Sequence, residues 1–188
     1  MNIGEALRRK FEGKTVDLTI GTNVLTEQPI YFHYGDQKEL VKWTQANSNK
    51  PKYPLVWYVI KPYREEPNDF KSVSSNLIIL HSFQDWQNQY SWLNDERYLK
   101  SYDAVIEPVW EVVKDTLSSA PSFLQVMGKL SDKYIIKDEP NFGVSADGIR
   151  TSQSDFTTKN KKGEKSITID IVDGRIIELE FRIKTKCI

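Results

Sequence analysis

The side chains that most often carry chemistry are few in this chain. It has two histidines, His33 and His81, and one cysteine, Cys187. No two of these residues stand at the spacing of a metal-ligand motif, whose ligands recur within a few positions. The sequence also lacks a glycine-rich phosphate loop, a GxSxG turn and an HExxH motif. We expect both histidines to be structural, and we expect no metal or organic cofactor.

Charged clusters offer only weak signals of chemistry. The acidic pairs are Glu65–Glu66 and Asp95–Glu96. Paired carboxylates can perform acid–base chemistry, but both pairs stand among polar residues, which is typical of a solvated face. The one basic cluster, Lys159–Lys165, could contact phosphates, although such a run is more often a solvated turn before a strand. The residues by themselves therefore predict no enzyme.

Aromatic residues are dense between Ser82 and Asn94, where Phe83, Trp86, Tyr90 and Trp92 stand among polar neighbours. Such residues usually fix a loop to the core. The rival interpretation is an interface, because tryptophan and tyrosine are favoured anchors of protein–protein contacts.

Composition narrows the class of protein. At 188 residues the default is a single domain, here 1–188. Lysine plus arginine and aspartate plus glutamate each number 26, and this balance argues against a dedicated nucleic-acid binder. One cysteine allows no disulfide framework within the chain, which fits a reducing compartment. No apolar stretch reaches the length of a membrane span, and the charged N-terminus does not resemble a secretory signal.

The elements that must organise the chain begin with two continuous apolar runs, Leu55–Ile60 and Asn76–His81. Such runs predict strands that are covered on both faces. The polar stretch between them, 61–75, is rich in charge and proline and predicts a long exposed loop in which only Phe70 requires a partner.

A long amphipathic helix is predicted from about Asp95 to Ser119. Steps of three and four place Leu99, Tyr102, Ile106, Val109, Val113 and Leu117 on one face. Pro108 should kink or divide this helix. Four further apolar residues widen the stripe and indicate a second packed surface; they are Tyr98, Val105, Trp110 and Val112.

The remaining segments give shorter predictions. Ile3, Ala6, Leu7 and Phe11 predict an N-terminal helix that ends at Gly13 and packs on its own domain. The alternation in Val16–Ile20 predicts a strand with one wet face. We expect an ordered loop or arm at 27–36, one or two helical turns at 37–46, a short helix at 122–130, a short strand at 134–136 and a long loop at 141–160.

A C-terminal β-hairpin is predicted from two alternating runs. Ile167, Ile169 and Ile171 form the apolar face of the first run, and Ile177, Leu179, Phe181 and Ile183 form that of the second. A two-residue loop at Asp173–Gly174 would set Ile169 against Glu178. A three-residue loop, Val172–Gly174, sets Ile169 against Ile177 and matches the apolar faces. The three-residue loop is the prediction, with Gly174 at positive φ.

Together these elements predict an α+β fold, in which a mixed or antiparallel β-sheet is packed by the long helix. Three stretches resemble neck and tail-completion proteins of tailed bacteriophages: KYPLVWYVIKPY (52–63), SNLIILHSF (75–83) and NDERYLKSYDAVIEPVWEVV (94–113). The resemblance covers about Lys52 to Ala120 and the order of elements. The proteins that the chain resembles include the tail-terminator-like or ring proteins of crAss-like and related phages of Bacteroidetes-type hosts.

This resemblance implies a structural virion protein and no catalytic residues. The chain would form a homo-oligomeric ring in the neck or tail, as a tail terminator, head–tail connector or tail-completion protein. Its partners would be copies of itself and neighbours such as the portal, connector or tail tube. It would meet no membrane, and it would meet DNA only through the ring lumen. The candidate interface residues are Arg64, Glu65, Phe70, Trp86, Tyr90, Trp92, Tyr98 and Trp110.

Two alternatives to the ring subunit remain at this point. One is a nucleic-acid-contacting adaptor that uses Lys159–Lys165. The other is a small-ligand-binding domain of a mobile element, for which a deep pocket with convergent polar groups would be the structural sign.

Overall fold

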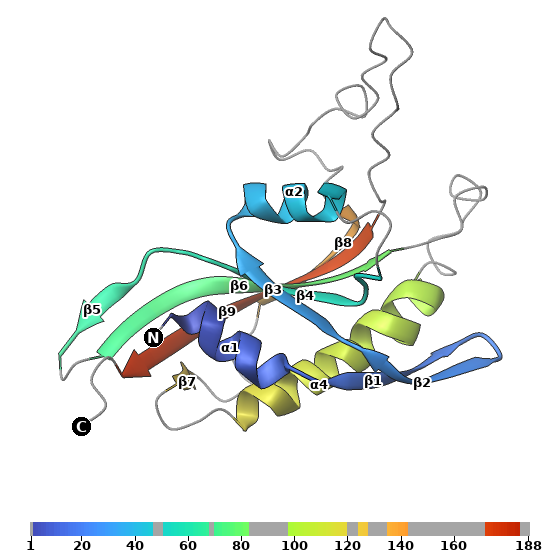
Figure 1. Cartoon of the computed structure of the whole chain (residues 1–188), viewed down its shortest axis with the longest axis horizontal. Helices are drawn as coiled ribbons and strands as arrows, with labels where there is room; N and C mark the ends of the chain where they lie inside the picture. The colour runs from blue at the N-terminus through green and yellow to red at the C-terminus, as the bar shows by residue number, and fades with distance from the viewer. Residues whose placement is uncertain are drawn as a thin grey trace, which may run out of the picture.

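The computed structural model describes residues 2–46, 51–67, 70–82, 98–119, 124–127, 135–142 and 172–184. It has the predicted α+β architecture, in which helices cover a mixed β-sheet (Figure 1). In chain order the elements are α1 (Ile3–Phe11), β1 (Thr15–Ile20), β2 (Asn23–Pro29), β3 (Tyr31–Gly35), α2 (Gln37–Ala46), β4 (Leu55–Val59), β5 (Arg64–Glu66), β6 (Phe70–Ser82), η2 (Tyr98–Ile106), α4 (Glu107–Ser118), β7 (Leu124–Met127), β8 (Ile135–Phe142) and β9 (Val172–Lys184).

The main sheet is built on a long antiparallel ribbon of β6 and β9. Each strand has 13 residues, and they pair from Phe70 opposite Lys184 to Ser82 opposite Val172. On one side of the ribbon, β4 and β5 pair with β6, and β3 adds beside β4. On the other side, β7 and β8 pair with β9. Because β3 runs parallel to β4 while the other described pairs are antiparallel, the seven-stranded sheet is mixed.

Hydrophobic cores lie on both faces of the sheet near β4. On one face, α1, β1, η2 and α4 contribute to a core that includes Phe11, Tyr102 and Phe181. On the other face, Leu40 of α2 joins a smaller core with Trp57 (Figure 1). Because both faces are covered, all five residues of β4 are buried. The prediction from its continuous apolar run is confirmed for Leu55–Val59, but the strand ends before Ile60, which is exposed.

The long helix consists of two parts with different hydrogen-bond patterns. It is π-helical from Tyr98 to Ile106 and α-helical from Glu107 to Ser118. Pro108 stands in the first turn of the α-helical part, and Ile106 just before that part is itself helical, with φ −67° and ψ −40°. The two parts therefore form one continuous helix. The sequence predicted a kink or a division at Pro108; the structure shows a change of hydrogen-bond pattern next to it but no break in the helix.

Most of the wide apolar stripe of this helix lies inside the domain, although Tyr98 is exposed. Val105 and Trp110, which the sequence assigned to a second surface, are buried in the core. The reason is that the helix contacts β1 as well as β6 and β9, so that two sheets share its apolar side. Leu99 differs from its prediction in the other direction. The sequence placed it on the packed face, but it is exposed, because η2 is π-helical and does not keep the α-helical spacing on which that prediction rests.

The predicted C-terminal hairpin is wrong. Val172–Gly174 is not a turn but the start of β9, and Gly174 lies opposite Leu80 of β6. Its φ is not positive; the described glycines with positive φ are Gly13 and Gly21. The strand β6 is long enough to pair with the whole of β9, and this ladder overrides the local turn signal. The other predicted strand, 167–171, lies outside the described residues.

Three predicted loops or helices are strands. The segment 27–36 holds the end of β2 and all of β3, because Phe32 faces the core and β3 gains a parallel partner in β4. The segment 61–75 is largely a β-hairpin of β5 and the first half of β6. The segment 122–130 contains β7, which pairs with β9. Of these strands, β3 and β7 depend on a partner that is more remote in the chain, whereas β2 and β5 pair within local hairpins.

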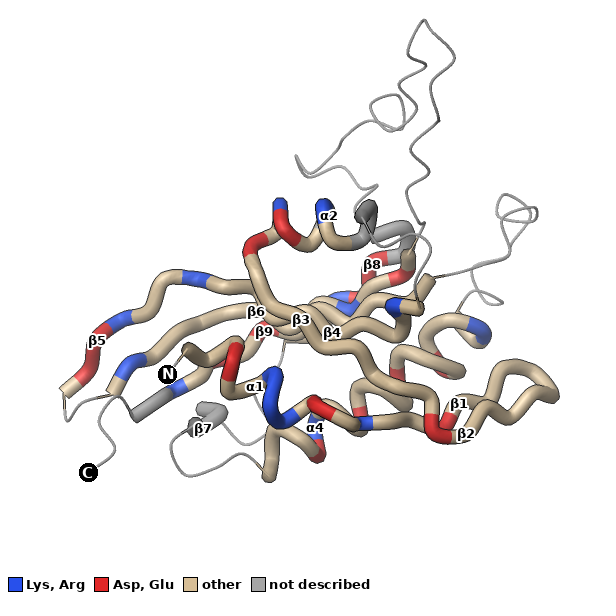
Figure 2. The backbone as a smooth tube through the Cα atoms, in the orientation of Figure 1, with Lys and Arg blue, Asp and Glu red and all other residues tan. Residues whose placement is uncertain are grey.

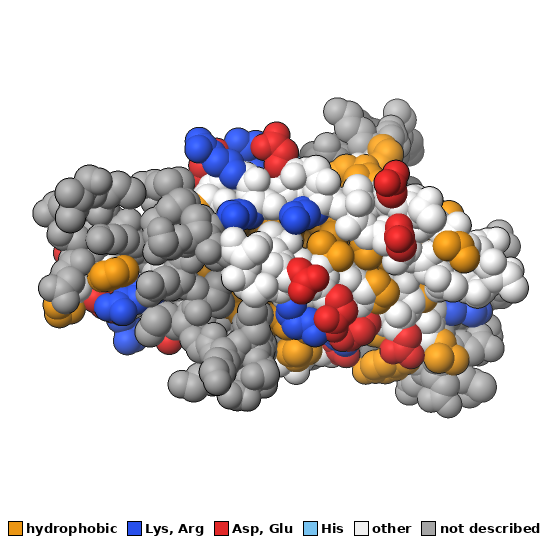
Figure 3. Space-filling model, turned by 90° about the horizontal axis from the view of Figure 1, so that it is seen from below, with side chains coloured by type: hydrophobic (Ala, Val, Ile, Leu, Met, Phe, Trp, Pro, Cys, Tyr) orange, Lys and Arg blue, Asp and Glu red, His pale blue; other side chains and the backbone are white. Residues whose placement is uncertain are grey.

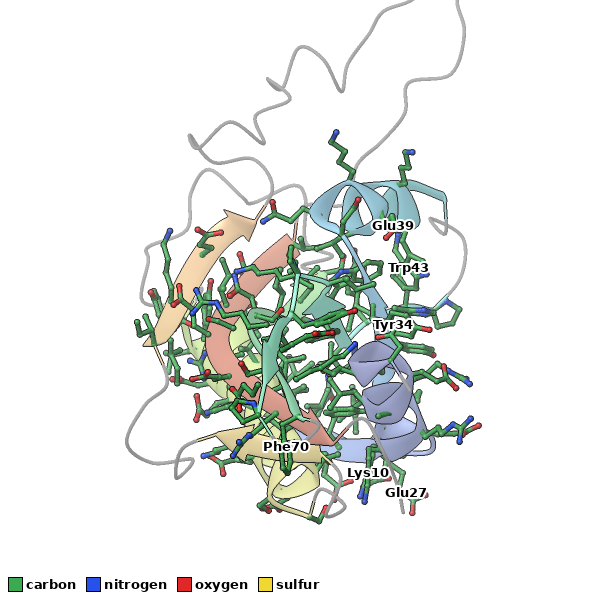
Figure 4. All side chains as sticks on the ribbon, turned by 90° about the vertical axis from the view of Figure 1, so that its left-hand side faces the viewer. Lys10, Glu27, Tyr34, Glu39, Trp43 and Phe70 are labelled. Carbon is green, nitrogen blue, oxygen red and sulfur yellow. The ribbon has the colours of Figure 1, made fainter. Side chains whose placement is uncertain are left out.

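The N-terminal helix and the turn into α2 follow local rules and are confirmed. In α1, Asn2 caps the helix by accepting from the Gly4 amide at 2.9 Å, and Phe11 stacks on Phe32 at 4.8 Å. At the start of α2, Asp36 and Glu39 accept each other's backbone N–H at 2.7 and 2.8 Å, which is a capping box. Figure 4 shows Glu39 and Trp43 on α2, on the side where β3 carries Tyr34.

Candidate functional site

A cluster of buried polar side chains lies at one end of the β6–β9 ribbon, on the face that the helix covers. Arg175 of β9 donates two hydrogen bonds to Asp138 of β8, at 2.7 and 3.1 Å, and also pairs with Glu107 of α4. Asp173, two residues earlier in β9, lies opposite His81 of β6. The cluster thus draws on the ribbon, on the sheet edge and on the helix.

Burial governs the charge states in this cluster. The pKa of His81 is lowered to about 4, chiefly because burial penalises the charged imidazole, while the carboxylate of Asp173 opposes that shift. The pKa of Arg175 is raised by its bonds to Asp138 and Glu107, which outweigh the effect of its burial. At neutral pH, His81 is uncharged, and Arg175 is charged and bonded to the carboxylates of Asp138 and Glu107.

The arrangement fits a structural connection better than a reactive centre. Arg175 uses its guanidinium on two carboxylates and so links β8 and the helix to β9. Tyr102 of η2 adds a third link by donating from its hydroxyl to the Gly174 carbonyl at 3.3 Å. Within the described ranges, no group of three or more His, Cys, Asp or Glu side chains could hold a metal ion.

His33, the second histidine, packs among aromatic rings. Its ring lies 4.6 Å from that of Trp43 on α2 and 6.3 Å from that of Trp57 on β4. Burial lowers the pKa of His33. These contacts place His33 in the small core between α2 and the sheet, in agreement with a structural role.

The most distinctive surface feature is the two-stranded hairpin of β1 and β2, here called the arm. It extends beyond the main sheet at one end of the long axis of the molecule (Figure 1). Residues 18–26 contain no charged side chain, as the uncharged outer part of the arm in Figure 2 shows. Val24 and Leu25 are 66% and 40% exposed there.

A second exposed hydrophobic group lies in the connection from β4 to β5, residues 60–64, here called the β4–β5 connection. Ile60 is 43% exposed and Tyr63 is 55% exposed, with the Lys71 ammonium 4.0 Å from the centre of the Tyr63 ring. Lys61 and Arg64 are exposed between and beside them. This connection leads to β5, which lies at the end of the molecule opposite the arm (Figure 1).

On the helix-covered side, the hydrophobic side chains of the described residues do not merge into one large area (Figure 3). Figure 3 views that side, and its hydrophobic side chains stand in small groups among charged ones. Exposed hydrophobic residues of the part that the structure describes are instead found at the arm, at the β4–β5 connection, at the start of η2 and on β8.

The predicted interface residues divide into three groups. Arg64, Glu65 and Tyr98 are exposed, as an interface requires. Phe70 is half-buried under the guanidinium of Arg182, at 4.2 Å from the ring centre, and so already has its partner. Trp110 is buried in the core, and its assignment to an interface is wrong.

Several predicted segments lie outside the described residues: Trp86, Tyr90, Trp92, the pair Asp95–Glu96, the cluster Lys159–Lys165 and Cys187. Sequence reasoning also missed the arm. The signal was present, because an uncharged run of nine residues, 18–26, contains a tight-turn glycine, Gly21, and two adjacent aliphatic residues.

Comparisons of the chain with protein-family models, with curated proteins and with solved structures found no match. Among the residues that the structure describes, no helix combines the length and the apolar character that crossing a membrane requires.

Proposed function

We propose that this chain is one subunit of a homo-oligomeric ring in the neck or tail of a tailed bacteriophage. The observation that carries the proposal is that two unlike groups of exposed hydrophobic residues lie on separate parts of an elongated molecule. Val24 and Leu25 lie on the arm at one end, whereas the β4–β5 connection, with Ile60 and Tyr63, runs from the middle of the sheet toward β5 at the other end (Figure 1).

The physical argument concerns symmetry. A ring of identical subunits is held by heterologous contacts, in which one surface of a subunit meets a different surface of the next. Two unlike surfaces on separate parts of the molecule supply such a pair, whereas a two-fold dimer needs only one surface that matches itself. The presence of two unlike surfaces therefore favours head-to-tail assembly.

The assignment to a phage rests on the sequence resemblance at Lys52 to Ala120. The described part of that stretch forms β4, β5, β6, η2 and α4, which are the spine of the sheet and the helix that covers it. A subunit that bears load between a capsid and a tail needs a rigid platform of this kind. The Arg175 links between helix and sheet stiffen it further.

Electron microscopy tests the proposal directly. The purified protein, and virions or assembly intermediates that contain it, should show a closed ring of copies at the junction of head and tail or at the end of the tail tube. An isolated copy in the particle, with the arm and the β4–β5 connection both facing solvent, would overturn the proposal.

The proposal also carries an expectation about cofactors, which rests on the missing sequence motifs. Native mass spectrometry of the purified protein should give the mass of the chain or its multiples without a bound metal or organic molecule. One zinc ion per chain, found by elemental analysis, would contradict it. A control protein with a known structural zinc should be measured under the same conditions.

A further inference from the structure

The arm is bent by a β-bulge at its base. Val16 pairs with Gln28 and Leu18 pairs with Leu25, so that Asp17 stands opposite two residues, Thr26 and Glu27. The extra residue leaves Glu27 with a φ of 52°, which is unusual for a residue with a side chain. The Asp17 carboxylate secures the bulge by accepting from the Glu27 amide at 2.8 Å. A bulge of this kind re-aims a strand pair, and here it sets the direction of the arm.

The outer arm lacks the devices that keep a strand pair from sticking to other proteins. Natural edge strands are protected by charged side chains, proline or a covering element. The arm has no charge from Leu18 to Thr26, and Val24 and Leu25 are exposed. Among the described residues, β1 and β2 pair only with each other. A bend that aims an uncharged, aliphatic tip away from the body indicates a docking element.

The β4–β5 connection has the chemistry that complements the arm. In its sequence, Ile60–Lys61–Pro62–Tyr63–Arg64, an exposed basic residue follows next to each of the exposed hydrophobic residues Ile60 and Tyr63. The acidic residue after it, Glu65, has the Lys71 ammonium 3.7 Å away. At the arm, the aliphatic tip is followed by an exposed acidic base, Asp17 and Glu27. If the two surfaces meet, the hydrophobic residues of the arm contact those of the connection, and the acidic base of the arm lies beside the basic residues of the connection.

We infer that the arm of one copy docks on the β4–β5 connection of a second copy. Val24 and Leu25 pack against Ile60 and Tyr63, and Glu27 lies beside the basic residues of the connection. This inference rests on the proposed ring and names the two surfaces through which its subunits meet. The contact is heterologous, because the arm and the connection are two different surfaces of each copy.

A charge exchange tests the pairing. In one variant, Glu27→Lys with Asp17→Asn makes the base of the arm basic, and the asparagine side-chain oxygen can still accept from the amide of residue 27. In another, Lys61→Glu with Arg64→Glu makes the connection acidic. Each variant alone then brings like charges together at every arm contact, and its self-association should weaken at least about tenfold by sedimentation velocity. An equal mixture should recover wild-type association, because each arm in an alternating assembly finds a connection of opposite charge.

The same mixture separates the inferred contact from its rivals. An arm that docks on another arm, or on a third surface, gives no recovery on mixing and overturns the inference. Circular dichroism of each variant should match the wild type, because the exchanged side chains are exposed. If one of these variants does not fold, the cross-linking experiment below tests the same contact, because it leaves all of these charged residues unchanged.

Cysteine cross-linking gives a second, direct measurement. In a Cys187→Ser background, a chain carrying Leu25→Cys is mixed with a mass-tagged chain carrying Tyr63→Cys and oxidised. The disulfide should join the two kinds of chain far more than either kind to itself. A matched control replaces Tyr63→Cys with Ile135→Cys, an exposed residue of β8 on the other side of the ribbon, and should give little product.

The outcomes distinguish the docking from the ring. A ring seen by microscopy without the Leu25–Tyr63 cross-link overturns the docking and leaves the ring standing. A cross-link that forms preferentially between two Leu25→Cys chains also overturns the docking. A chain that stays monomeric at about 1 mM and forms no cross-link overturns it as well, since such a contact would be weaker than about 4 kcal/mol of binding free energy.

Discussion

Arg175 links three elements of the described structure through its side chain, since it joins β9 to β8 and to α4. Its guanidinium is nearly buried, whereas Glu107 is partly exposed. Replacing Arg175 with methionine should therefore lower the free energy of unfolding by about 2–3 kcal/mol, chiefly because Asp138 loses its partner in a sheltered position. Urea denaturation measures this loss.

The matched control for that prediction is Glu107→Gln, which removes the more exposed partner of the same arginine. It should cost less than about 1 kcal/mol, because exposed ion pairs contribute little. Equal losses in the two variants would show that the cluster does not depend on the bidentate pair with Asp138.

His81 makes the stability depend on pH in a defined window. Its folded pKa is about 4, below the unfolded value of about 6.5. Above pH 6.5 the imidazole is neutral in both states and carries no penalty. As the pH falls from 6.5 toward 4, the unfolded chain binds a proton that the folded chain refuses. The free energy of unfolding should therefore fall, by up to about 3 kcal/mol.

A His81→Gln variant provides the comparison for this window. It keeps a polar side chain but does not titrate. The unfolding free energy of the wild type minus that of the variant should therefore become smaller as the pH falls from 6.5 to 4. A difference that stays constant across this window would show that His81 does not take up its proton on unfolding.

At the scale of elements, α1 depends on a close approach that only glycine allows. A Cβ added to Gly4 would lie 2.5 Å from Cγ and 2.6 Å from Cδ2 of Tyr34. Alanine is the better helix former by about 1 kcal/mol, yet Gly4→Ala should destabilise the protein by about 1–3 kcal/mol, because the ring must move within a packed contact. Thermal unfolding measures it, with the exposed Arg9→Ala as the control; a higher melting temperature for Gly4→Ala would contradict the prediction.

Elements marked by a helical period or by a continuous apolar run were predicted, and most strands without such a pattern were not. The spacing of Ile3, Leu7 and Phe11 predicts α1 because a helix bonds only to itself. The segment Val172–Gly174 has the local chemistry of a turn, yet it extends β9, because β6 supplies a ladder for it from about 90 residues earlier. Periodicity contains no information about such a partner.

The same limit explains the error at the interface. Trp110 widened the apolar stripe beyond what one sheet needs, and a second surface was the reasonable prediction. The structure supplies a second sheet, the arm, whose base packs on the helix inside the domain. The exposed surfaces instead came from two other places. Val24 and Leu25 lie in a stretch, 21–26, to which the sequence analysis assigned no element, and Ile60–Tyr63 were predicted as the end of a strand and the start of a loop.

At the scale of the whole molecule, assembly should depend on where hydrophobic residues are exposed rather than on how many there are. Val24→Lys with Leu25→Lys removes the aliphatic tip of the arm. Association should be lost, measured by native mass spectrometry, while the melting temperature should change by less than about 3 °C, since exposed side chains contribute little to folding.

The chain provides its own control for this prediction on β8. Ile135 and Ile136 are 64% and 44% exposed, close to the values for the two arm residues, but they lie on the sheet edge and outside the inferred contact. Ile135→Lys with Ile136→Lys removes a similar amount of exposed aliphatic surface and adds the same charge, so that general stickiness would be reduced equally. If the subunits meet through the arm, the β8 variant assembles like the wild type. Equal loss of assembly in both variants would mean that exposed aliphatic surface, not the arm, holds the copies together.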